Sequence, residues 1–206
     1  MMEKEKQLPN LNLILQSNRD YNNTNYPDVC IASGYDSDIF FRYRGDKYMR
    51  KNLILIVGKS GSGKDFMADA WNMTCVISRT TRKPRIHEVP GVSKVFISNS
   101  DMDNLIEKDE LVAYTKRNED RYGAIIEDIV NKDAYIIDPA GVEYMVNGGH
   151  PASLGLHLKT IYIYTSFYKR IYRMWKRKDG VTSIVKRIIL DRKEFKNVKY
   201  DIKIKN

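Results

Sequence analysis

The sequence predicts an α/β protein with a mostly parallel sheet, and three observations support this fold class. Continuous apolar runs, such as NLILIVG (52–58) and DAYIID (133–138), are typical of strands that are covered on both faces. Predicted helices follow such runs along most of residues 51–206. A glycine-rich turn, GKSGSGKD (58–65), joins the first run to the first helix. Strands that alternate with helices need crossover connections, which make neighbouring strands parallel.

The individual elements are assigned from periodicity and from turn-forming residues. Strands are expected at residues 52–58, 74–80, 94–98, 133–138, 159–165 and 200–205. Helices are expected at residues 64–72, 99–111, 166–178 and 181–195. Ser100 or Asp101 is the expected N-cap of the second of these helices. The long segment 80–94 is polar and contains two prolines, so we expect a loop there.

The first 50 residues form a separate N-terminal extension in this interpretation. They are rich in asparagine and turn formers, and the short apolar runs LNLIL, VCIA and DIFFRYR are candidate strands. We expect the boundary near residues 48–52, with the main domain over 51–206. No role is assigned to the extension.

Composition indicates a soluble protein of a reducing compartment. Hydrophobic residues make up 42% of the 206 and charged residues 30%, as is usual for globular proteins. The longest apolar run, LILIVG, is far shorter than the roughly 20 residues of a membrane helix. No signal-peptide pattern is recognisable in MMEKEKQLPN. Two cysteines make no disulfide framework, so a cytoplasmic location without a membrane partner is expected.

The net charge of +9 is concentrated near the C-terminus. Residues 159–206 contain 15 Lys and Arg residues against four acids. Nucleic acid and polyphosphate substrates both attract such a segment. No aromatic-basic RNA motif and no recognition-helix pattern is recognisable, so nucleic acid is not favoured as a partner.

The glycine-rich turn fits the phosphate-loop pattern G-x-x-x-x-G-K-[ST] except at its last position, which is Asp65. Its glycines let backbone N–H groups point at phosphate oxygens, and Lys64 can reach the β- and γ-phosphates. The predicted ATP-binding residues are Gly58, Lys59, Ser60, Gly61, Ser62, Gly63, Lys64 and Asp65. The Asp65 carboxylate is a hard oxygen ligand suited to Mg²⁺. Alternatively, Asp65 is simply the acid of a first helical turn.

A second candidate anion site lies in SRTTRKPRIHEVPGVSK (78–94). Arg82 and Arg85 form a fork for a planar anion such as phosphate, and Glu88 can orient one of them. A solvated basic loop is the alternative reading of the same residues.

The pattern S-x-T-T-R-x-P-R-x-x-E-x-x-G after a phosphate loop resembles the guanylate kinase family. The resemblance runs over residues 52–206 and includes RYGA (121–124), IIDPAG (136–141) and the closing YDIKIKN. Phage-type members with G-K-D in the loop are the most similar, so the host cytoplasm is implied for a phage-encoded chain. The resemblance implies a three-layer P-loop NTPase fold, with a small nucleoside-monophosphate (NMP) subdomain near 79–125 and a basic lid near 173–187. It also implies ATP- and Mg²⁺-dependent phosphorylation of GMP, dGMP or a related NMP.

Site residues are carried over by position. The resemblance implies that Arg82, Arg85 and Tyr122 hold the acceptor phosphate, that Ser78 contacts the base and that Glu88 supports the loop. The implied lid arginines, which clamp the ATP phosphates, are Arg173, Arg177 and Arg187. Asn206 is expected near the adenine. Asp138 ends a buried strand, where it is expected to bind Mg²⁺ through water, to face the acceptor, or to cap the turn before Pro139.

The sequence departs from the family pattern at the base-binding end. Lys94 stands where a second phosphate-binding tyrosine is expected, and lysine can still bind phosphate as a point charge. Ala113 and Ala124 stand where polar groups that contact the guanine are expected. Glu110 or Glu119 is a candidate substitute for the missing acid. A different or broader NMP specificity is therefore one alternative, and a non-catalytic guanylate kinase-like binding module is another.

Overall fold

The computed structural model describes residues 40–43, 47–50, 52–84, 88–148 and 156–206. Arg85 and the candidate strands LNLIL and VCIA lie outside these residues. The described part of the N-terminal extension is a hairpin of two antiparallel strands, β1 (Phe40–Tyr43) and β2 (Lys47–Arg50).

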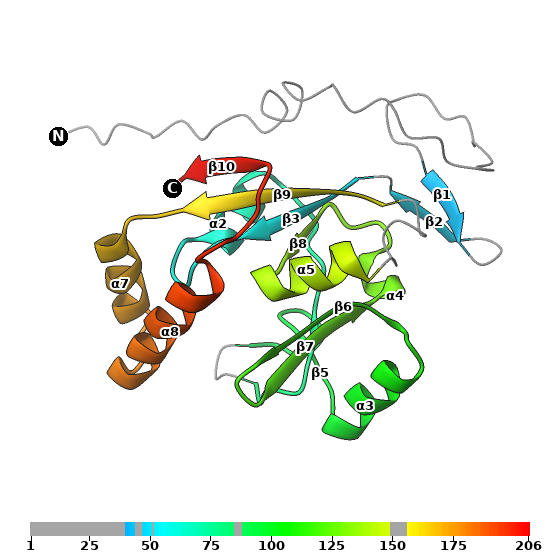
Figure 1. Cartoon of the computed structure of the whole chain (residues 1–206), viewed down its shortest axis with the longest axis horizontal. Helices are drawn as coiled ribbons and strands as arrows, with labels where there is room; N and C mark the ends of the chain where they lie inside the picture. Colours follow the sequence, from blue (N-terminus) through cyan, green and yellow to red (C-terminus); the bar gives the residue numbers. More distant parts are fainter. Residues whose placement is uncertain (1–39, 44–46, 51, 85–87, 149–155) are drawn as a thin grey trace.

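The main sheet contains four parallel strands, in the order β10-β9-β3-β8 (Figure 1). Their bounds are Asn52–Val57 for β3, Ala134–Ile136 for β8, His157–Tyr164 for β9 and Ile202–Lys205 for β10. The prediction of an α/β fold with a mostly parallel sheet is thus confirmed. Each strand falls within or overlaps an apolar run that predicted it.

Both faces of the main sheet are covered, because side chains along β3 alternate between two apolar clusters. Leu53 and Leu55 face a cluster that includes Met145 of α5 (Pro139–Asn147). Ile54 and Ile56 face another cluster, which includes Met67 of α2 (Lys64–Ala70). The continuous apolar run is therefore explained by burial on two sides, and helices and sheet form three layers.

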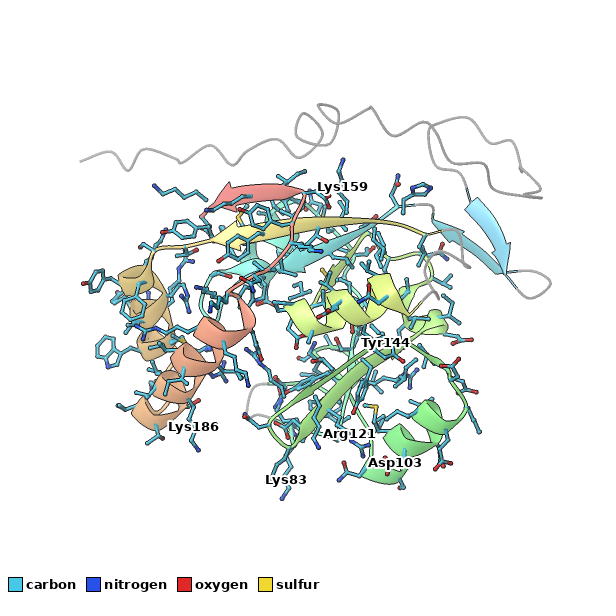
Figure 2. The ribbon with its side chains drawn as sticks, in the orientation of Figure 1. Lys83, Asp103, Arg121, Tyr144, Lys159 and Lys186 are labelled. Carbon is cyan, nitrogen blue, oxygen red and sulfur yellow. The ribbon has the colours of Figure 1, made fainter. Side chains whose placement is uncertain are left out.

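A second sheet lies beside the first, with the strand order β5-β4-β7-β6 (Figure 1). Its strands are β4 (Arg79–Thr80), β5 (Val95–Phe96), β6 (Leu111–Arg117) and β7 (Asp120–Ile125). The helices next to it are α3 (Asn99–Glu107) and α4 (Ile126–Ile129). Figure 2 shows Arg121 of β7 and Asp103 of α3 directed toward each other, and they form an ion pair.

Three predictions in this region are wrong in detail. The strand expected over 74–80 is reduced to β4 and a bridge at Cys75, because this segment leaves the main sheet and enters the second. The helix expected over 99–111 ends at Glu107, and Asp109 follows with a φ of 52°. Its N-cap is Ser98, whose hydroxyl accepts the Asp101 N–H in a capping box. The β6–β7 hairpin had no prediction at all.

Two helices follow β9 and lie at one end of the main sheet (Figure 1). They are α7 (Phe167–Lys176) and α8 (Val181–Glu194), as the two basic segments predicted. None of the helices in the described ranges has the length and apolarity needed to cross a bilayer.

Candidate functional site

The glycine-rich loop lies between β3 and α2, at the carboxyl end of β3. Gly61 and Gly63 have φ values of 76° and 84°, a left-handed conformation that suits glycine. The Lys64 ammonium donates to the Gly58 carbonyl oxygen at 2.7 Å. Burial lowers the pKa of Lys64 to about 8, against the opposing effect of Asp65 and Asp191. The local conformation is therefore that of an anion-binding loop with a lysine folded across it.

Two predicted donor-site residues from distant parts of the chain converge on this loop. The Arg173 guanidinium donates to the Ser62 carbonyl oxygen at 3.1 Å and to the Asn206 side-chain oxygen at 3.3 Å. The Asn206 amide donates to the same Ser62 carbonyl at 2.9 Å. A Cβ on Gly63 would come within 2.5 Å of the Asn206 amide nitrogen, so a larger residue there would displace the Asn206 side chain.

The other two predicted lid arginines have partners in or beside the lid helices. Arg177 pairs with the Asp179 carboxylate, and its side chain is 53% exposed. The Arg187 guanidinium donates to the Ser183 hydroxyl at 3.3 Å, within α8. The partners of Arg177 therefore differ from those of Arg173, although the two arginines are spaced i, i+4 on one helix.

A buried ionic cluster next to the loop was missed by sequence reasoning. The Asp191 carboxylate of α8 is 1% exposed. It accepts from the Ser60 N–H at 2.9 Å, from the Ser60 hydroxyl at 3.1 Å and from the Arg170 guanidinium at 2.5 Å. Arg170 also donates to the Ser60 carbonyl oxygen at 2.8 Å. Two acids near the end of an otherwise basic helix, Asp191 and Glu194, were the available signal, since such acids often have a specific partner.

The second anion site is built on the loop after β4. Arg82 donates to both Glu88 carboxylate oxygens, at 2.7 and 2.8 Å, so Glu88 is placed to orient this arginine. The backbone N–H of Arg82 donates to the Thr80 hydroxyl at 3.2 Å, which fixes the loop at this point. The Nε atom of Arg82 is buried and has no hydrogen-bond partner among the described residues. An unsatisfied guanidinium N–H in a cleft is a feature expected of an anion site without its anion.

Polar residues also gather at the base of this site. The Lys94 ammonium donates to the Ser78 hydroxyl at 3.2 Å. Burial lowers the pKa of Lys94, although nearby Asp65 partly offsets the effect. The Tyr135 hydroxyl also hydrogen-bonds Ser78, and burial raises the pKa of this phenol. Tyr135 was not predicted as a site residue, because it lies inside an apolar strand sequence.

One cleft of about 720 Å³ connects the two sites. The sequence-predicted residues that line it are Gly58, Ser60, Lys64, Asp65, Ser78, Arg82, Glu88, Lys94, Tyr122 and Asp138. One oxygen of the Asp138 carboxylate caps α5 by accepting the Gly141 N–H at 2.8 Å. Of the three roles expected for Asp138, this contact corresponds to capping. Thr115, Arg117 and Tyr135 also line the cleft and were missed.

The suggested substitutes for the missing acid do not reach the cleft. Glu110 and Glu119 are exposed and are not among its lining residues. Ala113 and Ala124 are buried in the apolar cluster that also contains Leu53. Thr115 of β6 lines the cleft instead, opposite Tyr122 of β7 and beyond a one-residue register irregularity between Leu111 and Ala113.

Asp65 is compatible with a magnesium site in the cleft. It is the exposed first-turn acid of α2 and lines the cleft beside Lys64. No group of three or more His, Cys, Asp or Glu side chains able to hold a metal occurs in the described ranges. Mg²⁺ commonly takes only one or two protein carboxylates and completes its shell with water and phosphate oxygens, so a single carboxylate fits.

Comparisons with known proteins place the chain in a family. Residues 50–206 match the family model described as guanylate kinase. The guanylate kinase of Malacoplasma penetrans is 36% identical over 90 residues, which are 41% of this chain and 46% of that protein. The guanylate kinase of Clostridioides difficile is 37% identical over 82 residues, 37% of this chain and 40% of that protein. These alignments thus span less than half of each relative.

A solved structure was also found. The crystal structure of guanylate kinase from Anaplasma phagocytophilum superposes with a TM-score of 0.49 and 19% identity, over 75% of this chain and 76% of that one. The family model covers more than half of the chain, including the glycine loop, the Arg82 loop and both lid helices. On this match, the chain belongs to the guanylate kinase family.

Proposed function

We propose that this chain is an ATP-dependent nucleoside-monophosphate kinase that phosphorylates GMP, dGMP or a related monophosphate to the diphosphate. The observation that carries the proposal is the single cleft that joins a glycine loop with its lysine to a second cationic loop. Two separate anion sites on one cleft suit two phosphates that must react with each other. The proposal assigns residues 51–206 to the kinase domain, residues 79–125 to acceptor binding and 1–50 to an extension.

The donor would be ATP, with its phosphates on the glycine loop. Backbone N–H groups of the loop and the Lys64 ammonium would hold the β- and γ-phosphates. Arg173 and Asn206 already contact the Ser62 carbonyl and would lie beside the bound nucleotide. Arg177 and Arg187 would join them by exchanging their present partners for phosphate. Mg²⁺, held through Asp65, would neutralise charge on the transferred phosphoryl group.

The acceptor monophosphate would bind at Arg82, with Arg85, Tyr122 and Lys94 around it. The buried Nε of Arg82, which has no hydrogen-bond partner among the described residues, is a donor available for this phosphate. The Glu88 carboxylate holds one terminal nitrogen of the Arg82 guanidinium, and the Lys83 carbonyl oxygen holds the other at 2.7 Å, so the guanidinium is oriented before the anion arrives. Ser78 and Tyr135 would face the base. An acceptor phosphate oxygen then attacks the γ-phosphorus of ATP in line, the bond to the β-phosphate oxygen breaks, and ADP leaves.

A coupled assay with ATP, Mg²⁺ and each of GMP, AMP, CMP, UMP and their deoxy forms tests the proposal. We expect turnover with at least one acceptor, and loss of turnover in Lys64→Met. Thermal shifts with the same monophosphates should identify the preferred base, because a bound ligand stabilises the folded state by mass action. ATP binding without turnover on any acceptor would contradict the kinase and favour a binding module.

A further inference from the structure

We infer that Arg117 is a positioning residue, which fixes the distance between the acceptor-binding sheet and the phosphate loop through the carboxylates of α8. This inference rests on the proposed kinase activity. Its basis is a contact that joins the second sheet to helix α8 and that none of the predicted site residues makes.

Arg117 is the last residue of β6, in the sheet that carries the acceptor site. Its guanidinium forms a bidentate pair with Glu194 of α8, at 3.1 Å from Nε and 2.7 Å from Nη2. The same Nη2 atom lies 3.4 Å from the Asp191 carboxylate. Two parallel N–H···O bonds fix both distance and orientation, which a single lysine contact would not do.

The α8 carboxylates continue this link to the donor side. Asp191 accepts from the backbone N–H of Ser60, so α8 is bonded to the phosphate loop itself. Arg170 of α7 holds the other side of the same carboxylate. Arg117 of β6 thus bonds Glu194 and contacts Asp191, both on α8, and Asp191 in turn bonds Ser60, so β6 is linked to the phosphate loop through this helix.

The partial burial of this path makes it stiff. The side chains of Arg117 and Glu194 are 28% and 19% exposed, and that of Asp191 is 2% exposed. Burial opposes ionisation of Glu194 and raises the pKa of its carboxyl, while the Arg117 guanidinium acts in the opposite direction. Separating Arg117 from α8 would leave carboxylates without their cation in a partly dehydrated site, so the bonded arrangement is favoured.

The chemistry explains why such a link matters. The acceptor site belongs to one sheet and the donor loop to the other, so neither site alone determines how far apart the two phosphates lie. In-line transfer is sensitive to that distance, and a misplacement of about 1 Å can cost roughly 100-fold in rate. Arg117 should therefore affect turnover much more than it affects the binding of either nucleotide.

A double-mutant cycle on the full chain tests this inference. Arg117→Met keeps the aliphatic stem and removes the fork, and Glu194→Gln removes the partner charge. With the fastest acceptor of the panel, we expect Arg117→Met to lower kcat by about 10- to 100-fold while KM for ATP and acceptor changes less than about threefold. Glu194→Gln should lower kcat in the same way. The double variant should be no slower than the slower single variant, because both changes break one link.

Lys116→Met is the matched control, since Lys116 is the exposed neighbour of Arg117 on β6. Its kcat should stay at the unmutated value. Calorimetric titration with ADP should give unchanged stoichiometry in every variant, which separates a lower kcat from a smaller folded fraction. If Arg117→Met does not fold, Glu194→Gln with unchanged stoichiometry gives the same answer.

Several results would overturn the inference. A slow Arg117→Met together with a normal Glu194→Gln, or additive losses in the double variant, would mean that Arg117 acts directly on a phosphate. Normal kcat in both single variants would mean that the link does not set the reacting distance. Absence of turnover in the unmutated chain would remove the kinase proposal, and this inference with it.

Discussion

The donor side and the acceptor side of the cleft differ in how their arginine side chains are paired. On the donor side, Ser60, Asp191 and Arg170 bond one another, and Arg173 and Asn206 share the Ser62 carbonyl. The buried atom without a partner among the described residues on this side is the uncharged Ser62 hydroxyl. On the acceptor side, Arg82 keeps a buried Nε without a partner among the described residues, and Lys94 is held with a lowered pKa.

This difference implies that the two sides are organised in different ways before a ligand binds. The backbone of the donor loop is held in shape by the protein, so nucleotide binding there would mainly exchange the present bonds of Lys64, Arg177 and Arg187 for bonds to phosphate. The acceptor site holds cationic groups and hydrogen-bond donors that are not fully paired within the protein, and a bound anion would complete their bonding. Substitutions on the donor side should therefore mainly cost stability, whereas those on the acceptor side should mainly cost activity.

The largest expected effect is on stability, at Asp191. Replacing it with alanine leaves the buried Arg170 without its counterion and frees the Ser60 N–H, which should lower the free energy of unfolding by about 3–5 kcal/mol. The acceptor-side comparison is Asp128, which pairs with Arg79 at 2.8 Å and is more exposed. Asp128→Ala should cost about 2 kcal/mol. Urea unfolding at pH 7 measures both, and equal losses would break the distinction between the two sides.

The second effect is on activity, at Arg82. Arg82→Met should lower kcat/KM for the acceptor about 100-fold, which is about 2.7 kcal/mol, because charge-assisted bonds to the phosphate are lost. Affinity for ATP should not change. Lys83→Met is the control, since the Lys83 side chain is exposed and points away from the protein in Figure 2. An equal loss in the control would indicate a general charge effect of the loop.

The sequence predicted the donor side more completely than the acceptor side. The donor loop is a contiguous motif, so GKSGSGKD was enough to place Lys64 at the carboxyl end of β3. The main-sheet strands followed from apolar runs, because burial on two faces leaves a strong local signal. The second sheet was harder, since β4 and β5 have only two residues each and their pairing is long-range.

The site residues that the sequence did not predict have partners far away in the chain. Asp191 and Ser60 are 131 positions apart, and Arg117 and Glu194 are 77 apart. Tyr135 belongs to a strand that was assigned by its apolar content, and Arg117 belongs to β6, which was not assigned at all. Pairing at such separations depends on how the two sheets are placed, and composition and spacing carry no information on that placement.

A smaller effect is expected in the pH dependence of ATP binding. Because the pKa of Lys64 is lowered to about 8 in the free protein, its charged form predominates below that pH. Bound phosphates favour the ammonium, so the pKa rises on binding and a proton is taken up above pH 8. ATP affinity should therefore be greatest below pH 8 and about tenfold weaker at pH 9.

Calorimetry in two buffers of different ionisation enthalpy measures this proton uptake directly. The unmutated chain should take up close to one proton per ATP near pH 9, and Lys64→Gln should take up none. Zero uptake in the unmutated chain would show that Lys64 stays charged in the free loop, and the donor side would then be less desolvated than the structure indicates.

The smallest expected effect concerns Asp65, which is the point where the two sides meet. Its carboxylate lies in the first turn of α2 and also influences the pKa of Lys94 across the cleft. If it holds Mg²⁺, Asp65→Ala should raise the Mg²⁺ concentration for half-maximal rate up to about fivefold, as expected of one exposed charge contact. Asp65→Ser should stay within about threefold of the unmutated rate, because a hydroxyl is also an oxygen ligand for Mg²⁺.

If Asp65→Ala changes neither the Mg²⁺ dependence nor the rate, the carboxylate only stabilises the helix N-terminus. The metal would then be held by phosphate and water alone, and the donor side would be built entirely from backbone and basic groups.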